Sequence, residues 1–226
     1  MGDYVGNSAD GMVYGAHAVY ATARSTSTGF SITSATDYGV GQRLSAGTYT
    51  TYRGFLKFDT SAIPDNSDIN SVKLRLSAHS DDTDTDFDLE IVKFDWSAFD
   101  PITAANREAA YDGALAALAD DNIWRNTAGV VLDNPYESGD LDPLWINKTG
   151  YTYYALRSKN DYDNVAPVGS ENIGITTAEY SVAEYRPYLV ITYTPPHYKK
   201  CCMILAADIR KIMGFREFKV KKLAGE

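Results

Sequence analysis

Apolar and polar residues alternate along two neighbouring stretches of the chain, residues 50–60 and 71–78. One face of the first stretch carries apolar side chains in a row with Gly54: Tyr52, Leu56 and Phe58. The second stretch does the same with Val72, Leu74, Leu76 and Ala78. A period of two is typical of β-strands, and the turn-forming residues of segment 61–70 separate the two stretches. The pattern therefore predicts two strands that flank a turn, with an apolar face that the rest of the chain must cover.

A third alternating stretch follows at residues 86–91. Phe87, Leu89 and Ile91 alternate with acidic residues. We expect this strand to lie antiparallel to the second one across a loop at residues 80–85. That arrangement would bring Arg75 near Glu90, where opposite charges contribute a few tenths of a kcal/mol.

Further strands are predicted over residues 11–24, 123–133, 151–161, 172–180 and 186–196. One longer helix is expected after Asp100 and Pro101, with an apolar stripe of Tyr111, Leu115 and Leu118 that Gly113 weakens. A miniature helix is expected between Asp142 and Gly150, because Asp can cap a helix and Gly can end it. The chain is thus predicted to be all-β, with two antiparallel layers and one or two short helical insertions.

Length and charge divide the chain into two parts. Its 226 residues fit one all-β domain, residues 1–196, and a short C-terminal arm, residues 197–226. The whole chain has 21 Lys and Arg against 30 Asp and Glu, and the arm has 8 against 3. The domain is left with 13 against 27, so its net charge is about −14 and that of the arm about +5. The acidic domain repels nucleic acid, while the basic arm suits an acidic surface, including another copy of the domain.

The arm has the pattern of an amphipathic helix followed by a weakly alternating stretch. Its apolar positions are Leu205, Ile209, Ile212, Phe215 and Phe218. Such a stripe outside the predicted sandwich needs a partner. The arm either folds back on its own domain or binds a neighbour, and both alternatives stay open.

Targeting signals and a membrane span are not predicted. The first residues have neither a basic region nor an apolar run, so we expect no export signal. The apolar part of the arm is too short and too charged to span a bilayer.

Aromatic residues gather at one place in the chain: Trp145, Tyr151, Tyr153 and Tyr154. Tyrosine is abundant overall, with 17 Tyr against 8 Phe. Aromatic rings can stack on sugars, so these four residues are candidates for carbohydrate binding. Half of each strand must face the core, however, and ordinary packing explains the same residues.

An acidic loop holds Asp81, Asp82, Asp84 and Asp86. Oxygen-rich loops bind calcium, and Asp82, Asp84 and Asp86 are the candidate ligands. The spacing of a helix–loop–helix calcium site is not met, because Phe87 stands where that site needs Gly. The alternative is an acidic, solvated loop without a metal, and no other cofactor is expected.

No catalytic motif is found in the sequence. The three histidines, His17, His79 and His197, share no metal-ligand spacing, and the adjacent Cys201 and Cys202 lie in the arm. A carboxylate pair of the glycosidase type would meet only in the fold. We therefore expect a protein that is not an enzyme.

Several segments resemble a known family: YRGFLKFDTSAIP, INSVKLRL, WINKTG, LRSKND, TTAEY and RPYLVITYTPP. Over residues 10–196 the chain resembles the DNRLRE-type domain, a relative of carbohydrate-binding modules. The resemblance implies a jelly-roll β-sandwich, as found in phage structural proteins, microbial surface proteins and accessory modules of polysaccharide-degrading enzymes. The helix near residues 109–119 departs from the looser loop expected there.

Two functions follow as hypotheses. The first is a virion structural protein, such as a phage capsid decoration, capsid-associated or tail component, whose arm binds other virion proteins or copies of itself. The second is a carbohydrate-binding module or adhesin that acts outside cells or at a microbial surface and binds glycans.

Overall fold

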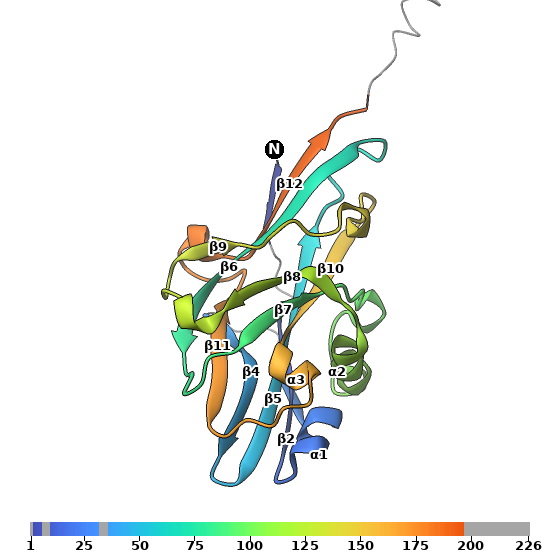
Figure 1. The fold of residues 1–226 in the computed structure, drawn as a ribbon. Helices are drawn as coiled ribbons and strands as arrows, with labels where there is room; N and C mark the ends of the chain where they lie inside the picture. The colour runs from blue at the N-terminus through green and yellow to red at the C-terminus, as the bar shows by residue number, and fades with distance from the viewer. Residues whose placement is uncertain (1, 6–9, 32–35, 197–226) are drawn as a thin grey trace, which may run out of the picture.

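The computed structural model describes residues 2–5, 10–31 and 36–196 (Figure 1). The strands formed there are β1 (Gly2–Val5), β2 (Gly11–His17), β3 (Gly29–Ser31), β4 (Asp37–Ser45), β5 (Thr48–Asp59), β6 (Asp68–Asp81), β7 (Asp88–Val92), β8 (Ala119–Asn126), β9 (Pro135–Glu137), β10 (Tyr151–Ser158), β11 (Ser170–Thr176) and β12 (Tyr188–Thr194). The α-helices are α1 (Tyr20–Ser25), α2 (Arg107–Ala116) and α3 (Lys159–Tyr162). Four 3₁₀ turns complete the described part: η1 (Ser97–Phe99), η2 (Thr127–Gly129), η3 (Pro143–Trp145) and η4 (Ala183–Tyr185).

The strands form an antiparallel jelly-roll β-sandwich, so the expected fold class is confirmed. One sheet has the order β4-β11-β6-β9 and the other the order β5-β10-β7-β8. The β4–β5 hairpin joins the two, so that both belong to one sheet that curls over itself. Strands β1 and β12 continue along β6, while β2 and β3 extend the layer of β5.

The two strands expected to flank a turn exist, but they do not pair with each other. Strand β5 pairs with β2, β4 and β10, and β6 pairs with β9, β11 and β12. In a jelly roll these consecutive strands lie in opposite sheets. The alternation therefore identified the inward face of each strand correctly. The two faces meet across the interior of the sandwich, however, and do not lie side by side in one layer.

The predicted pairing of β6 with β7 is wrong for the same reason. Strand β7 lies between β8 and β10, in the sheet opposite β6. Arg75 is opposite Tyr188 and Glu137, and Glu90 is opposite Arg157. The expected proximity of Arg75 and Glu90 does not occur.

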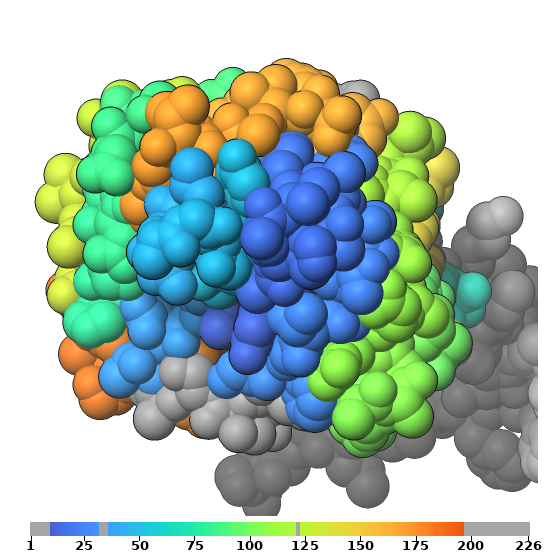
Figure 2. Space-filling model, turned by 90° about the horizontal axis from the view of Figure 1, so that it is seen from below, coloured from blue at the N-terminus to red at the C-terminus, as the bar shows by residue number. Residues whose placement is uncertain are grey.

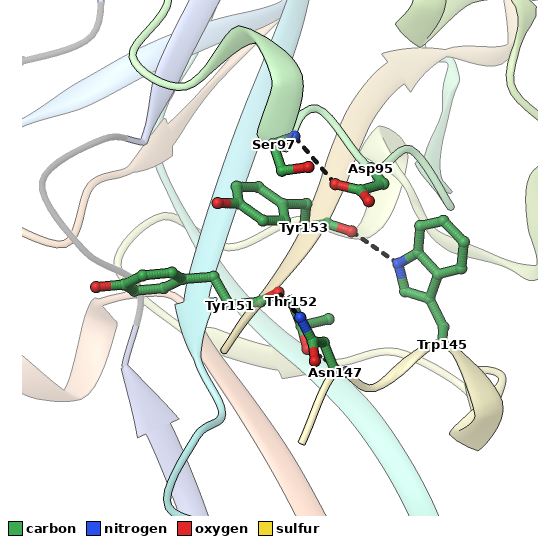
Figure 3. A pocket seen from close by; sticks show the side chains of 7 residues that line it. All are labelled: Asp95, Ser97, Trp145, Asn147, Tyr151, Thr152 and Tyr153. Carbon is green, nitrogen blue, oxygen red and sulfur yellow. Dashed lines mark hydrogen bonds between the residues drawn. The ribbon is translucent and has the colours of Figure 1, made fainter. Parts of the chain in front are cut away.

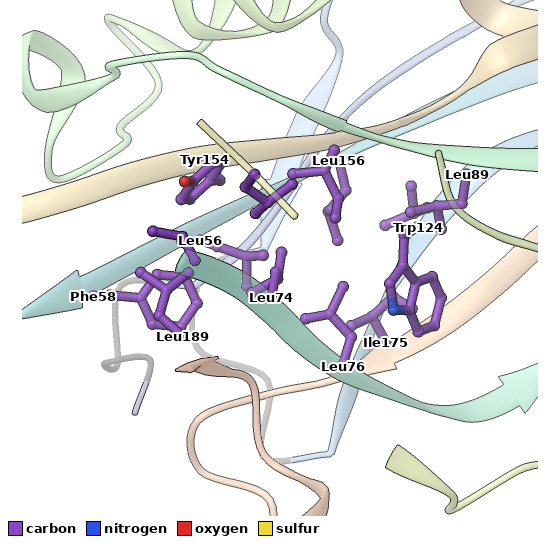
Figure 4. Close-up of a cluster of buried hydrophobic side chains, with 14 of the residues drawn as sticks. Leu56, Phe58, Leu74, Leu76, Leu89, Trp124, Tyr154, Leu156, Ile175 and Leu189 are labelled. Carbon is purple, nitrogen blue, oxygen red and sulfur yellow. The ribbon is translucent and has the colours of Figure 1, made fainter. Parts of the chain in front are cut away.

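The interior of the sandwich is an apolar core formed by both sheets (Figure 4). Leu56 and Phe58 of β5 and Leu156 of β10 come from one layer, and Leu74 and Leu76 of β6 from the other. All five side chains are fully buried. Burial of large apolar side chains stabilises the fold by roughly 1.5–3 kcal/mol each, so this core supplies much of the stability.

A second apolar core covers the outer face of the β5 layer. It is formed by Phe55, Trp96 and Tyr153 together with the buried face of α2. The Trp96 ring stands edge-on to Phe55 and to Tyr153, with ring centroids 5.7 and 4.9 Å apart. Its indole N–H donates to the Tyr154 carbonyl oxygen at 3.1 Å. The β5 layer is therefore buried on both faces.

Helix α2 is shorter than the sequence predicts. It begins at Arg107, so Asp100 and Pro101 lie outside it, and it ends at Ala116. Tyr111 is buried as expected, whereas Leu118 lies beyond the helix and is 73% exposed. A side chain at Gly113 would collide with the ring of Phe94, so the glycine allows α2 to pack closely there.

A buried ion pair fastens the helices to the sheet. Arg53 of β5 binds both carboxylate oxygens of Asp161 in α3, at 2.8 and 3.1 Å. Two further N–H groups donate to the carbonyl oxygens of Tyr111 in α2 and Arg24 in α1, each at 2.9 Å. The guanidinium also lies over the Tyr111 ring, 3.7 Å from the centroid. One strand side chain thus contacts all three helices.

A second buried arginine, Arg157, lies at the C-terminal end of α2. Arg157 of β10 donates to the carbonyl oxygens of Ala114, Leu115 and Ala117, and its Nε donates to Glu90 of β7 at 2.8 Å. The last carbonyls of a helix lack partners within the helix, and a cation there also favours the helix dipole. Arg157 therefore caps the C-terminus of α2 from the sheet.

The end of the molecule at the β4–β5 turn is closed by segments distant in sequence. Figure 2 shows α1, the β4–β5 hairpin and the loop after α3 side by side. The Arg24 side chain of α1 donates to the carbonyl oxygens of Asp161 and Tyr162, and Gln42 of β4 donates to that of Val165. Within residues 2–5, 10–31 and 36–196, no helix is long and apolar enough to cross a membrane.

The Arg53→Ala substitution should lower the free energy of unfolding by about 3–5 kcal/mol, because it leaves the Asp161 carboxylate buried with much of its partner charge removed. Urea denaturation measures the effect. Arg43→Ala is the matched control: this exposed arginine of β4 lies 5.9 Å from the Tyr52 ring, and we expect a change within about 0.5 kcal/mol. Equal effects of the two substitutions would contradict the role of the ion pair.

Asp10 predicts an unusual pH dependence of stability. Burial raises the pKa of its carboxyl well above the usual range, although the Lys57 backbone N–H donates to Oδ1 at 3.0 Å. The unfolded chain therefore releases this proton at lower pH than the folded chain, and folding is disfavoured increasingly above about pH 4. Asp10→Asn keeps an acceptor for Lys57, so it should be more stable than the wild type at pH 7 and equal to it near pH 3. Denaturant titrations at the two pH values measure the difference, and a variant that is less stable at pH 7 would refute the assignment.

Candidate functional site

A shallow pocket lies where β10 begins, between the η3 turn and the segment before η1 (Figure 3). Its volume is about 130 Å³. It is lined by Asp95, Ser97, Trp145, Asn147, Tyr151, Thr152 and Tyr153. Three of the four aromatic residues singled out from the sequence therefore meet at one site.

The η3 turn fixes Trp145 at one side of this pocket. Asp142 precedes the turn, and its Oδ1 accepts a hydrogen bond from the Leu144 N–H at 2.9 Å. Its Oδ2 is 3.1 Å from the Lys93 ammonium. The hydrogen bond from the Leu144 N–H lowers the pKa of the Asp142 carboxyl below its usual value, and the contact with the Lys93 ammonium lowers this pKa further. The predicted miniature helix is thus a single 3₁₀ turn with the expected cap.

The Trp145 ring is held by the neighbouring strand. Its indole N–H donates to the Tyr153 carbonyl oxygen at 2.7 Å, so only the ring is left to contact a ligand (Figure 3). Asn147 supports the same turn, because its backbone N–H donates to Thr152 Oγ1 at 3.0 Å and its amide donates to the Tyr151 carbonyl oxygen at 3.2 Å. The segment before β10 is therefore tied to β10 at three places.

Tyr151 and Tyr153 stand on the outer face of β10, two residues apart. Their rings are tilted by 58° with centroids 6.4 Å apart. Tyr151 is 41% exposed, and the Lys57 ammonium lies 4.2 Å from the centre of its ring. Lys57 also binds Asp100 at 2.6 Å, so this cation is held in place over the ring.

Tyr153 is mostly buried and forms the floor of the pocket. Its hydroxyl donates to Asp100 Oδ2 at 3.2 Å. Burial, and then the negative charge of Asp100, raise the pKa of this hydroxyl above its usual value. Tyr153 therefore stays a neutral hydrogen-bond donor at any physiological pH.

Tyr154 does not belong to this site. Its side chain points to the opposite face of β10 and is fully buried in the interior core (Figure 4). Because successive side chains of a strand alternate between its faces, Tyr153 and Tyr154 cannot both reach the pocket. As a candidate for sugar binding, Tyr154 is corrected to a core residue.

Two polar residues of the pocket were not singled out from the sequence. The Asp95 side chain is exposed and accepts a hydrogen bond from the Ser97 N–H at 3.0 Å, and Asn147 lies across the pocket from it (Figure 3). Asp95 is fifty residues from Trp145 in the chain. No local pattern could have joined them, because the jelly-roll connections bring them together.

Two carboxylates of the acidic loop bind neighbouring segments of the domain. Asp84 accepts from the Ser170 N–H at 2.9 Å and Asp86 from the Thr127 hydroxyl at 3.0 Å. Asp82 is exposed, and its backbone N–H donates to the Asn172 carbonyl oxygen. Among residues 10–31, 36–120 and 123–196, no three His, Cys, Asp or Glu side chains lie close enough together to hold a metal ion.

A cluster around His79 was missed by the sequence analysis. His79 Nδ1 lies 2.9 Å from Asp133 Oδ1, and the Tyr180 hydroxyl lies within 3.2 Å of both. The three residues come from β6, the loop before β9 and the segment after β11, so they meet only in the fold. The cluster ties these loops to the outer edge of the sandwich. His17 does not belong to this cluster. Its Nδ1 accepts a hydrogen bond from the nearby Val19 N–H.

The apolar residues of the arm, Leu205, Ile209, Ile212, Phe215 and Phe218, and also His197, lie outside the described residues.

Comparison with known proteins gave no match, either to a protein-family model or to a curated protein. The site is therefore interpreted from its own geometry.

Proposed function

We propose that the protein is a non-enzymatic structural component of a virus particle, such as a capsid decoration, capsid-associated or tail protein of a phage. Its sandwich would be displayed on the particle, and its C-terminal arm would anchor it to other virion proteins or to copies of itself. The observation that supports this proposal is the separation of charge between an acidic domain and a basic, apolar arm. Opposite charges on two parts of one chain favour contacts between neighbouring copies.

The construction of the domain suits display on a particle. Two apolar cores and two buried arginine–carboxylate pairs all lie within residues 10–196. These features give the domain an apolar interior and buried ion pairs of its own. The resemblance of residues 10–196 to the DNRLRE-type domain of phage structural proteins and microbial surface proteins supports the same assignment.

Removal of residues 197–226 should abolish incorporation into particles and leave the domain folded, because two apolar cores and two buried ion pairs are formed among residues 10–196. Co-sedimentation with purified particles measures incorporation, and thermal unfolding should shift by no more than about 4 °C. A truncated protein that is incorporated like the full chain would contradict the anchoring role. Antibodies against the domain should label intact particles, since the sandwich is displayed outward.

A second candidate function is carbohydrate binding, and the pocket at the start of β10 supports it. An exposed ring at Tyr151, a fixed ring at Trp145 and an acceptor at Asp95 suit a sugar, which offers an apolar ring face and hydroxyl donors. The volume of about 130 Å³ is below the 300–1,000 Å³ usual for buried small ligands. Such a site would bind one residue of a glycan weakly and gain strength from many displayed copies.

If the pocket binds glycans, Trp145→Ala and Tyr151→Ala should each weaken binding about tenfold, as expected for an aromatic contact at the centre of an interface. Tyr162→Ala is a matched control, because Tyr162 is 42% exposed and carries the Arg157 guanidinium over its ring at 4.0 Å. Glycan arrays probed with the multivalent protein measure the effect. A blank array, or equal losses for all three variants, would count against this function.

A further inference from the structure

A second hollow lies on the other side of the η3 turn, at the start of β6. Its volume is about 260 Å³. It is lined by Ser67, Asp68, Ile69, Pro143, Leu144, Ile146 and Lys148. We call these residues the Leu144 groove, since Leu144 is 92% exposed, more than any other large apolar side chain of the described residues.

Leu144 is held outward by a rigid turn. Its backbone N–H donates to Asp142, its neighbour Trp145 is fixed by the Tyr153 carbonyl, and Ile146 is buried in the interior core. The exposure of Leu144 is therefore set by the conformation of η3. A large apolar side chain held in water at a fixed place is typical of a contact point for a partner.

The floor and rim of the groove are also ordered. Ile69 packs partly against the interior core, and Ile146 continues this apolar floor. The Lys148 ammonium donates to the Ser67 carbonyl oxygen at 2.9 Å, which ties the η3 loop to the turn before β6. The groove is thus preformed, so a partner would pay little to order it.

The C-terminal arm leaves the sandwich beside this groove. In the pairing of β12 with β6, Tyr193 is opposite Ile69 and Thr194 is opposite Asp68, and both partners line the groove. The Asn70 amide donates to Thr194 Oγ1 at 3.0 Å and holds the strand end in place. Thirty residues of chain follow from residue 197 on, and they carry the basic charge and the apolar stripe.

The direction of β12 indicates which copy the arm would reach. Figure 1 shows β12 pointing away from the body at its C-terminal end. Pro195 and Pro196 follow, and consecutive prolines favour an extended chain at this point. The eleven steps along the chain from Thr194 to Leu205 span at most about 40 Å, which is enough to reach a neighbouring domain.

We propose that the Leu144 groove of one copy receives the apolar stripe of a second copy's arm, formed by Leu205, Ile209 and Ile212. This inference rests on the proposed function, in which the arm anchors the protein to its neighbours. The net charges of about −14 on the domain and +5 on the arm bring the two together at long range, and the groove provides the apolar contact. The contact is heterologous, because arm and groove are different surfaces, and it links copies head to tail.

Two full-length variants test the proposal. Leu144→Asp removes the apolar contact of the groove, and Ile209→Asp removes it from the arm. Each variant alone should associate at least tenfold more weakly than the wild type in light scattering coupled to size-exclusion chromatography. An equimolar mixture should form dimers and no larger species, because one intact groove and one intact arm remain in each pair.

Val168→Asp is the matched control, since Val168 is 84% exposed and follows α3, at the end of the molecule shown in Figure 2. It should associate like the wild type, and all variants should keep the wild-type melting temperature. A wild-type protein that stays monomeric at every concentration would overturn the proposal, including the case in which the arm occupies the groove of its own chain.

The remaining outcomes distinguish a failure of the proposed groove contact from a failure of the proposed anchoring function of the arm. If Leu144→Asp associates like the wild type while Ile209→Asp does not, the arm binds at another place on the neighbouring copy. The proposed contact with the groove is then wrong, and the anchoring function stands. If both variants associate like the wild type, the groove is wrong and the apolar stripe of the arm is not the anchor either.

Discussion

The buried pair of Arg53 and Asp161 is the interaction on which the arrangement of the outer layer depends. A guanidinium in the middle of a strand face is costly to bury unless every N–H group finds an acceptor. Here the acceptors come from α1, α2 and α3, so each helix has a fixed place relative to β5. The helices of this protein are held to the sheet by charge as well as by apolar contact, whereas the sandwich interior is apolar.

Two of the segments that carry the resemblance to the DNRLRE-type domain meet at this pair. YRGFLKFDTSAIP contributes Arg53, and LRSKND contributes both Arg157 and Asp161. These residues stabilise the domain and do not reach either surface hollow. A third segment, WINKTG, supplies Trp145 and Asn147 to the pocket and Ile146 and Lys148 to the groove. The fold that the resemblance implies does not fix a function, which has to be argued from the surface.

Both surface features depend on one short turn. In η3 and the residue after it, Leu144 lines the groove, Trp145 lines the pocket and Ile146 enters the interior core. A 3₁₀ turn directs successive side chains about 120° apart, so three consecutive residues can serve three environments. The buried Ile146 fixes the orientation of the other two. The proposed glycan contact and the proposed contact between copies thus share one structural support.

The local alternation of residues predicted which side chains of β5 and β6 face the interior of the sandwich. Leu56, Phe58, Leu74 and Leu76 are buried as their spacing indicates, and Asp142 caps its turn as expected, because these preferences act within a few residues. The helix was predicted in place but too long, since Arg157 and the sheet decide where α2 ends. The aromatic cluster was identified as well, although the pattern could not say which rings face outward.

Strand partners, buried charges and the two surface hollows were decided by the tertiary structure alone. Periodicity shows the face of a strand but carries no information about its neighbour, so β6 and β7 were expected to pair although they lie in opposite sheets. Arg53 has the sequence pattern of a solvated residue, and only the distant Asp161 makes its burial favourable. Asp95 and Trp145, or Asp68 and Thr194, come together because the chain crosses repeatedly between the sheets, a long-range effect that no short stretch of residues contains.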